Sequence, residues 1–349
     1  MKKNLLIFFC LCSVYCAESQ NLPRVIILAT GGTIAGQGAN ADRAAYIPAK
    51  LPIEDLLASI PSIKKIAAIN GEQIASVGSY DMTTEIWIKL AKRINEIFAK
   101  NEADGVVVTH GTDTQEETAF FLNLTITSDK PVVLTGAMRP ATAISADGPK
   151  NLYDAIVVAS DPTSVGKGVI ISFNETLYDA IHVVKVNTTH VNAFDSPNTG
   201  AIGQVYDGKV NYYNQALQKQ NGHAHFKISS LDHLPKVDIV YMYVDASATA
   251  ISAFINDETD GLIIAGSGNG SINKAILQAV EAGVKKGIMI VRSSRVGSGR
   301  VTSTQVFDDE KLGTIAANNL NPQKARILLM LALTVTKDKN VIREIFLNY

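Results

Sequence analysis

Two short segments that end in threonine are the best candidates for chemistry in this sequence. The strand candidate 25–29 leads into the TGGT segment 30–33, and the strand candidate 106–108 leads into the THGTD segment 109–113. In an open α/β sheet, ligands bind at the carboxyl ends of strands, where glycine lets the backbone approach a ligand and helix N-termini offer free N–H groups. A single threonine at such a place commonly only caps a helix. Two matched copies favour two hydroxyl groups that face one cavity.

Sequence motifs for other common chemistries are incomplete. The glycine-rich segment 31–36 lacks the G-x-G-x-x-G order of a dinucleotide site, and the sequence has no G-x-S-x-G elbow of a serine hydrolase. Segment 203–209 fits G-x-x-x-x-G-K, but Val210 stands where a magnesium-binding serine or threonine belongs. His223 and His225 have no third ligand placed beside them, so we expect two solvated histidines and no metal site.

The elements that must position these threonines alternate along the chain. Apolar runs rich in β-branched residues are separated by helical patterns, such as the face shared by Ile86, Leu90 and Ile94 and the helix that follows Asn321. This alternation is typical of parallel strands joined by crossover helices, so it predicts an α/β fold. The strand candidates are 25–29, 106–109, 132–134, 169–173, 239–242, 262–265 and 288–291.

Length and composition predict a soluble protein with two domains. The chain has 349 residues, of which 46% are hydrophobic, and its net charge of -1 removes the basic excess that binding to nucleic acid needs. A single core stops growing at about 250–300 residues, so we expect two cores. Because residues 207–235 are polar, we expect a larger N-terminal domain with a mostly parallel, helix-flanked sheet at 18–215, a linker at 216–234 and a smaller C-terminal α/β domain at 235–349.

The N-terminal segment 1–17 has the composition of a secretion signal. Two lysines precede the apolar run 5–14, and cleavage is predicted after Ala17. The run is shorter than the ~20 residues that a bilayer span needs, so we expect a periplasmic or secreted protein without membrane insertion. A lipoprotein site at Cys16 is a weaker alternative. All three cysteines lie in this segment, so the mature chain is expected to have no disulfide and no catalytic thiol.

Five blocks in order along the chain resemble the bacterial type II L-asparaginases, which are secreted amidohydrolases that convert asparagine to aspartate and ammonia. The resemblance covers nearly the whole mature chain. It implies the two-domain fold of that family and a reaction without cofactor or metal. The blocks are 28–36, 109–114 with 116–119, 136–140 with 145–149, 291–296 and 320–326.

The resemblance implies two groups of catalytic residues. Thr33 is the hydroxyl that attacks the amide carbon, and Tyr46 lies in a loop whose small and polar residues suit a lid that closes over it. Thr112, Asp113 and Lys185 form the second group, in which apolar neighbours draw the lysine into the protein. Burial would lower the pKa of this lysine so that it can take a proton from a threonine hydroxyl, whereas Asp113 would favour the charged form. Whether Thr112 attacks, activates water or holds substrate stays open at this point.

The resemblance also implies how a free amino acid is held, with two departures from the family. Tyr80 stands where the family has glutamine, and Val306, counted without gaps, stands where it has glutamate. A lost hydrogen bond to a charged group typically costs about 1.5 to 3 kcal/mol. We therefore expect Asp113 to hold the substrate ammonium. In addition, either Asp308 or Asp309 shifts into the site, or the substrate binds more weakly. The implied substrate-binding residues are Gly32, Ser79, Tyr80, Gly111, Asp113, Ala137 and Asn269.

The expected function is an L-asparaginase with weak glutaminase activity, and two alternatives are compatible with the sequence. One is a glutaminase-asparaginase of broader specificity, because one additional carbon in the substrate is worth only about 1 to 3 kcal/mol. The other is an amino-acid-binding homologue with weakened catalysis. The family further implies a homotetramer, a dimer of dimers, whose sites lie between the N-terminal domain of one chain and the C-terminal domain of a partner chain that contributes Asn269.

Overall fold

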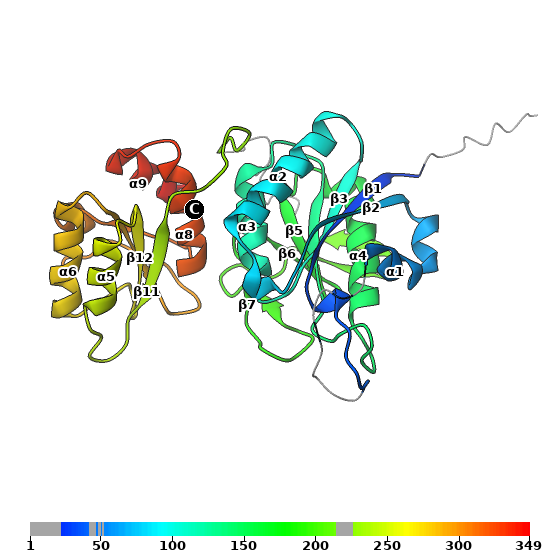
Figure 1. Ribbon diagram of the computed structural model, residues 1–349, viewed down its shortest axis with the longest axis horizontal. Coiled ribbons are helices and arrows are strands. Elements are labelled where there is room, and N and C mark those ends of the chain that lie inside the picture. Colours follow the sequence, from blue (N-terminus) through cyan, green and yellow to red (C-terminus); the bar gives the residue numbers. More distant parts are fainter. Residues whose placement is uncertain (1–21, 42–46, 48–49, 51, 214–225) are drawn as a thin grey trace, which may run out of the picture.

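The computed structural model describes residues 22–41, 47, 50, 52–213 and 226–349. This part of the chain forms two α/β domains that lie side by side, each built on its own sheet (Figure 1). The larger sheet has eight strands and the smaller sheet has four. The arrangement confirms the predicted two-domain α/β fold. The predicted secretion signal and residues 216–225 of the predicted linker lie outside the described residues.

Five neighbouring parallel strands make up one side of the larger sheet, and all of them except the edge strand have side chains buried on both faces. Along β1 (Arg24–Gly31), Ile26 and Leu28 join the core on one face, whereas Val25 and Ile27 join the core on the other. The parallel strands are, in order across the sheet, β2 (Ala68–Val77), β1, β3 (Gly105–Thr109), β4 (Val132–Thr135) and β5 (Val169–Phe173). The antiparallel strands β6 (Thr176–Asp179), β9 (Gly203–Tyr206) and β10 (Lys209–Tyr212) extend the sheet beyond β5.

Helices cover both faces of the larger sheet. Helices α2 (Thr84–Ala99) and α3 (Gln115–Thr125) pack on one face, where Trp87 stacks on Phe121 with ring centroids 5.3 Å apart. Helices α1 (Ile53–Ala58) and α4 (Gly148–Ser160) pack on the other face. The short 3-10 helices η2 (Pro61–Lys65) and η4 (Pro162–Ser164) each begin with proline, whose fixed φ suits a first helical position.

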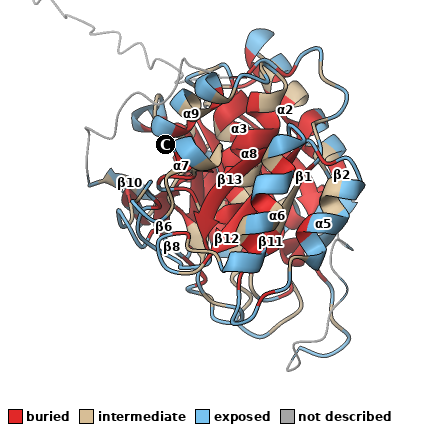
Figure 2. Cartoon of the chain, turned by 90° about the vertical axis from the view of Figure 1, so that its left-hand side faces the viewer, coloured by how far each residue is buried: buried red, intermediate tan, exposed pale blue. Residues whose placement is uncertain are grey.

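The smaller domain has the same layered plan, and one of its helices joins the two domains. Helix α8 shares a single apolar core with β12 and with α3 of the larger domain. The outer sides of α5 and α6 are exposed above buried strands (Figure 2). The parallel sheet consists of β11 (Val237–Tyr241), β12 (Gly261–Gly266), β13 (Met289–Ser294) and β14 (Ile315–Ala316), and its helices are α5 (Thr249–Asn256), α6 (Lys274–Lys285), α7 (Asp309–Leu312), α8 (Pro322–Leu333) and α9 (Lys339–Leu347).

All seven strand candidates overlap parallel strands of the two sheets. The sequence patterns missed β2, whose polar residues 70–73 are mostly exposed at the edge of the sheet, and they missed the short antiparallel strands. A strand at an edge does not need to bury both faces, so it carries no continuous apolar run. Among the described helices, none combines the length and the apolar character that a membrane crossing requires.

Candidate active site

Thr33 and Thr112 line the same open cleft, which has a volume of about 700 Å³. They follow the carboxyl ends of neighbouring parallel strands, in which Ala29 of β1 pairs with Thr109 of β3. Thr33 opens the 3-10 helix η1 (Thr33–Ala35). The two residues are only 7% and 4% exposed, so both are largely enclosed by protein where they line the cleft. The two hydroxyl-bearing residues that the sequence predicts to face one cavity are thus brought together.

Glycine brings the two threonine loops into backbone contact. Gly32 has a φ of 81°, which L side chains rarely adopt, and a Cβ there would lie 2.3 Å from the main-chain nitrogen of Gly111. A Cβ on Gly111 would lie 2.6 Å from Ser79 Oγ. Between the strands themselves, Thr30 Oγ1 donates to the carbonyl of Thr109 at 2.9 Å. A side chain at Gly32 would therefore push the two hydroxyl-bearing loops apart, and one at Gly111 would displace Ser79.

Lys185 reaches the same cleft from a short strand, β7 (Val184–Lys185), which pairs with β8 (Phe194–Asp195). Lys185 Nζ donates to Thr112 Oγ1 at 2.9 Å and to Asp113 Oδ1 at 2.6 Å. The lysine side chain is 15% exposed and the aspartate side chain is 56% exposed. Thr112 Oγ1 in turn donates to Met138 Sδ at 3.3 Å. The ammonium group thus holds the hydroxyl oxygen, and a neutral amine at the same place would accept the hydroxyl proton.

Ser79 and Tyr80 lie side by side in the 3-10 helix η3 (Ser79–Asp81), with opposite exposure. Ser79 is buried, its Oγ accepts a hydrogen bond from the main-chain nitrogen of Asp113 at 3.2 Å, and its carbonyl accepts one from Thr114 Oγ1 at 2.8 Å. Tyr80 is 67% exposed. Ser79 therefore fixes the loop that carries Thr112 and Asp113, whereas the phenol of Tyr80 lies at the surface.

One wall of the cleft comes from the loop between β4 and α4, where the sequence assigned only Ala137. Ala137 is fully buried, whereas the next residues of this loop line the cleft. The carboxylate of Asp147 holds the wall by accepting hydrogen bonds from the main-chain nitrogens of Met138 and Arg139, both at 2.9 Å. An aspartate directly before a Gly-Pro helix start is the sequence signal for this anchor. The wall residues are Met138, Arg139, Pro140, Ala143, Ile144 and Ser145.

His110 is fully buried and anchors the segment that leads to Thr112. Trp87 Nε1 donates to Thr118 Oγ1 at 2.7 Å, Thr118 Oγ1 lies 2.8 Å from His110 Nε2, and His110 Nδ1 lies 2.6 Å from the carbonyl oxygen of Gly111. Because a carbonyl only accepts, Nδ1 carries the proton and Nε2 accepts from Thr118. Burial lowers the pKa of His110 to about 4, so the ring is neutral at ordinary pH.

Asn269 belongs to the smaller domain and is not among the described residues that line this cleft. It follows β12, where its Oδ1 accepts a hydrogen bond from the main-chain nitrogen of Thr302 at 2.8 Å. Its Nδ2 donates to Thr302 Oγ1 at 3.1 Å. The exposed Asn269 is therefore held by Thr302 and is not part of the cleft wall of its own chain.

Both candidate replacement carboxylates in the segment after Thr302 have partners within their own chain. Val306 is 78% exposed. Asp308 accepts hydrogen bonds from two main-chain nitrogens as the N-cap of α7. Asp309 is ion-paired with the fully buried guanidinium of Arg292, at 2.6 and 2.7 Å. A shift of Asp309 into the cleft would leave that guanidinium without its counter-charge, so the structure argues against this part of the expectation.

Three residues singled out in the sequence, Tyr46, His223 and His225, lie outside the described residues. Within the described ranges, no three His, Cys, Asp or Glu side chains are grouped so that they could hold a metal ion. The segment 203–209 forms the hairpin of β9 and β10 at the sheet edge, and a hairpin has no helix N-terminus to hold a phosphate. The resemblance of this segment to a phosphate loop is therefore accidental.

Comparison with known families covers both domains. The model of the family described as Asparaginase, N-terminal, matches residues 24–218, and that of the Glutaminase/Asparaginase C-terminal domain matches residues 236–346. A solved structure described as a probable cytoplasmic L-asparaginase from Campylobacter jejuni superposes with a TM-score of 0.90 at 49% identity. The match covers 94% of this chain and 100% of that chain.

Curated relatives match over almost the same length. "Probable L-asparaginase periplasmic" of Haemophilus influenzae is 48% identical over 95% of this chain and 94% of its own length. "L-asparaginase 2" of Escherichia coli is 47% identical over 94% of both chains. The glutaminase-asparaginase of Acinetobacter glutaminasificans is 43% identical over 93% of this chain and 99% of its own. With both family models matched and the fold shared, this chain belongs to the asparaginase family.

Proposed function

We propose that this protein hydrolyses the side-chain amide of L-asparagine to L-aspartate and ammonia. The observation that carries the proposal is the pair of threonines in one cleft, with an ammonium nitrogen 2.9 Å from Thr112 Oγ1. Amide hydrolysis by covalent catalysis needs a nucleophile and a group that moves its proton, and a hydroxyl beside an amine is suited to both tasks. Relatives named L-asparaginase support this substrate.

In the proposed mechanism, Thr33 Oγ1 attacks the amide carbon of the substrate. Its hydroxyl proton passes to the amide nitrogen, the carbon–nitrogen bond breaks, and ammonia leaves an acyl ester on Thr33. Water then adds to the ester carbon and gives one proton to the threonine oxygen, and the ester bond breaks. Aspartate leaves with a new carboxylate, and the second proton of the water passes to ammonia. The loop of Tyr46 is proposed to close over this reaction and to exclude bulk water.

The second group is proposed to hold the substrate and to manage protons. Lys185 fixes the Thr112 hydroxyl at 2.9 Å, and Asp113 fixes the lysine at 2.6 Å. The half-exposed Asp113 carboxylate also suits the substrate ammonium, since it faces the cleft. Ser79, whose Oγ accepts a hydrogen bond from the Asp113 main-chain nitrogen, is proposed to hold the substrate carboxylate together with Gly32 and Gly111.

Substitutions at Thr33 test the proposal. Thr33→Ala is expected to abolish ammonia release from asparagine and to retain binding of aspartate, whereas Thr33→Ser should keep part of the activity because it keeps a hydroxyl. Full activity of Thr33→Ala would overturn the nucleophile assignment. A wild-type protein that binds asparagine but releases no ammonia would instead support the amino-acid-binding alternative.

A glutaminase-asparaginase is the second candidate because two positions of this chain depart from the family pattern. Tyr80 and Val306, which are both largely exposed, supply neither the amide nor the carboxylate that the family has at these positions. One relative of similar length is named glutaminase-asparaginase. Comparison of kcat/KM for ammonia release from asparagine and from glutamine decides between the candidates.

Assembly and location complete the proposal. A homotetramer built as a dimer of dimers would bring Asn269 of a neighbouring chain to the cleft, which fits the finding that Asn269 is not among the described residues lining the cleft of its own chain. The predicted secretion signal and the name of the Haemophilus influenzae relative support a periplasmic location, whereas the Campylobacter jejuni structure carries a cytoplasmic name. Light scattering of the purified protein and N-terminal sequencing of the exported form test these two points.

A further inference from the structure

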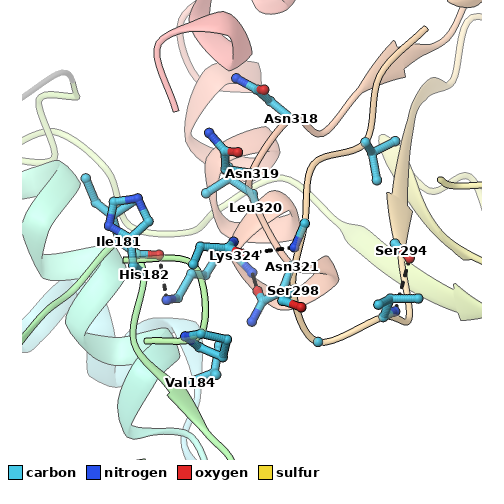
Figure 3. A pocket seen from close by; sticks show the side chains of 16 residues that line it. Ile181, His182, Val184, Ser294, Ser298, Asn318, Asn319, Leu320, Asn321 and Lys324 are labelled. Atoms are coloured by element: carbon cyan, nitrogen blue, oxygen red, sulfur yellow. Dashed lines mark hydrogen bonds between the residues drawn. The ribbon is translucent and has the colours of Figure 1, made fainter. Parts of the chain in front are cut away.

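The backbone that leads into Lys185 is held by helix α8 of the smaller domain. Lys324 extends from this helix across the domain boundary, and its Nζ donates to the carbonyl oxygens of Ile181 at 2.7 Å and Val183 at 2.5 Å. Figure 3 shows this side chain pointing from α8 towards the segment that carries Ile181, His182 and Val184. Lys324 is 1% exposed, so solvent does not compete for its protons.

Glu116 holds the next main-chain group of the same segment. Its Oε2 accepts a hydrogen bond from the main-chain nitrogen of Lys185 at 2.5 Å, and its Oε1 accepts one from Asn321 Nδ2 at 3.3 Å. Asn321 is the N-cap of α8, where its Oδ1 accepts from the main-chain nitrogen of Lys324 at 2.9 Å. A single buried carboxylate therefore connects α3, the strand of Lys185 and the first turn of α8.

These contacts secure the edge of β7 that β8 leaves unpaired. On the paired edge, the main-chain nitrogen of Val186 donates to the carbonyl of Ala193 at 2.8 Å. Successive residues of a strand point their main-chain groups to opposite edges, so the nitrogen of Lys185 faces away from β8. Glu116 accepts from that nitrogen. The backbone of Lys185 is thus fixed from both sides.

The charges around this junction compensate one another. Burial raises the pKa of Glu116, and the charge of Lys324 acts in the opposite direction. Burial lowers the pKa of Lys324 to about 8, and the carboxylates of Glu116, Asp179 and Glu117 oppose that shift. Asp179 in turn accepts hydrogen bonds from the main-chain nitrogen and the ring of His182. Removing the charge of Glu116 or of Lys324 therefore leaves the other buried and less well compensated, whereas Glu117 contributes least of the three carboxylates to the charge balance of Lys324.

We propose that Glu116, Asn321 and Lys324 are positioning residues for Lys185, and that the smaller domain sets the geometry of the amine beside Thr112 through them. The functional part of this inference rests on the proposed amide hydrolysis. None of the three residues lines the cleft, and Glu116 bonds directly to the Lys185 main chain, so we expect their effect on the reaction to pass through Lys185. A displacement of about 1 Å at a reacting group can cost about 10²-fold in rate.

The experiment compares Glu116→Ala with Glu116→Gln and with a matched control, Glu117→Gln, on the next position of the same helix. In Glu116→Ala we expect kcat for asparagine to fall between about tenfold and 10²-fold, because the Lys185 nitrogen loses its acceptor. KM and the dissociation constant of aspartate should change less than the rate. Glu116→Gln keeps an oxygen that can accept this hydrogen bond, so it should recover most of kcat, and Glu117→Gln should match the wild type.

A second measurement reports on Lys185 without any reaction of substrate. Brief acetylation with acetic anhydride, followed by mass spectrometry, gives the labelling rate of Lys185 relative to Lys311, whose side chain is 83% exposed. Glu116→Ala and Lys324→Met should raise this ratio severalfold over the wild type, and Glu117→Gln should leave it unchanged. If the wild type releases no ammonia, the proposed function fails while this ratio still tests the positioning.

Two results would overturn the inference. One is a folded Glu116→Ala protein with wild-type kcat and a wild-type labelling ratio. The other is an equal loss of kcat in Glu116→Ala and Glu117→Gln, because such a result would indicate a general effect of changing α3. Thermal unfolding of every variant identifies the folded fraction to which each rate is normalised.

Discussion

Replacement of Thr112 by valine isolates the contribution of one hydroxyl group in the cleft. Valine has nearly the same shape as threonine, so the change removes Oγ1 without opening a cavity. The oxygen accepts from Lys185 Nζ at 2.9 Å and donates to Met138 Sδ at 3.3 Å, and both hydrogen bonds are lost. A hydrogen bond to a charged group is worth about 1.5 to 3 kcal/mol, which sets an upper limit on the loss of stability. Lys185 keeps its bond to Asp113 at 2.6 Å, so we expect less than that limit.

The expected loss of activity is much larger than the loss of stability. A positioned group that transfers a proton contributes about 10² to 10⁴-fold to a rate. If Thr112 and Lys185 move protons during hydrolysis, kcat of Thr112→Val should fall by about this factor. The fold should persist, with a decrease in Tm of no more than several degrees.

Steady-state release of ammonia from asparagine measures kcat and KM, and calorimetry measures Tm. Thr112→Ser serves as the matched control because it keeps a hydroxyl at the same position, and it should retain more activity than Thr112→Val. A Thr112→Val protein with kcat within about threefold of the wild type would refute a role for this hydroxyl in proton transfer. A rise of KM with an unchanged kcat would instead assign Thr112 to substrate binding.

Replacement of Asp309, the counter-charge of the buried Arg292 guanidinium, tests how much this ion pair stabilises the smaller domain. Asp309→Asn should lower the free energy of unfolding by about 3 to 5 kcal/mol because Arg292 is fully buried. Asp308→Asn, at a side chain 32% exposed, should cost less than about 1 kcal/mol, and urea unfolding measures both. Burial raises the pKa of Glu117 to about 7 from the ordinary value of 4.5, so the folded state binds this proton more tightly than the unfolded chain. Its contribution to stability is complete below about pH 4.5 and is lost as pH rises through 7, and Glu117→Gln should remove this part of the pH dependence in urea unfolding. Val306→Glu is expected to lower KM for asparagine and to raise the preference for asparagine over glutamine, and unchanged kinetic constants for both amides would refute a role for this position.

The predictable part of the fold is the part that must be buried on both sides. Val25 and Ile26 point to opposite faces of the larger sheet, and both are buried, so β1 appears in the sequence as an unbroken apolar run. Strand β2 pairs with β1 in parallel but lies at an edge, where residues such as Asn70 are exposed. The pattern of β2 therefore resembles that of a loop, and sequence periodicity alone did not find it.

The site residues that could be predicted from the sequence are those that directly follow a buried parallel strand. Thr33 and Thr112 could be placed together because parallel strands end at one edge of a sheet. Lys185 lies on an isolated two-residue strand, so its place followed only from the family resemblance. Glu116 was missed because a glutamate in the first turn of a helix ordinarily interacts with the helix dipole, and its partner Asn321 is far away in the sequence.

The residues of the cleft are held by contacts from both domains, so the active site in the larger domain depends on the smaller domain. Thr112 is held from within the larger domain, since His110 and Ser79 fix its loop. Lys185 is held from across the boundary, since Lys324 fixes the backbone that leads into it. An isolated larger domain would keep the threonine pair, but it would expose the apolar surface that α3 shares with α8 and would lose the contacts that hold the amine 2.9 Å from Thr112 Oγ1. The distance between these two groups is therefore a property of both domains together.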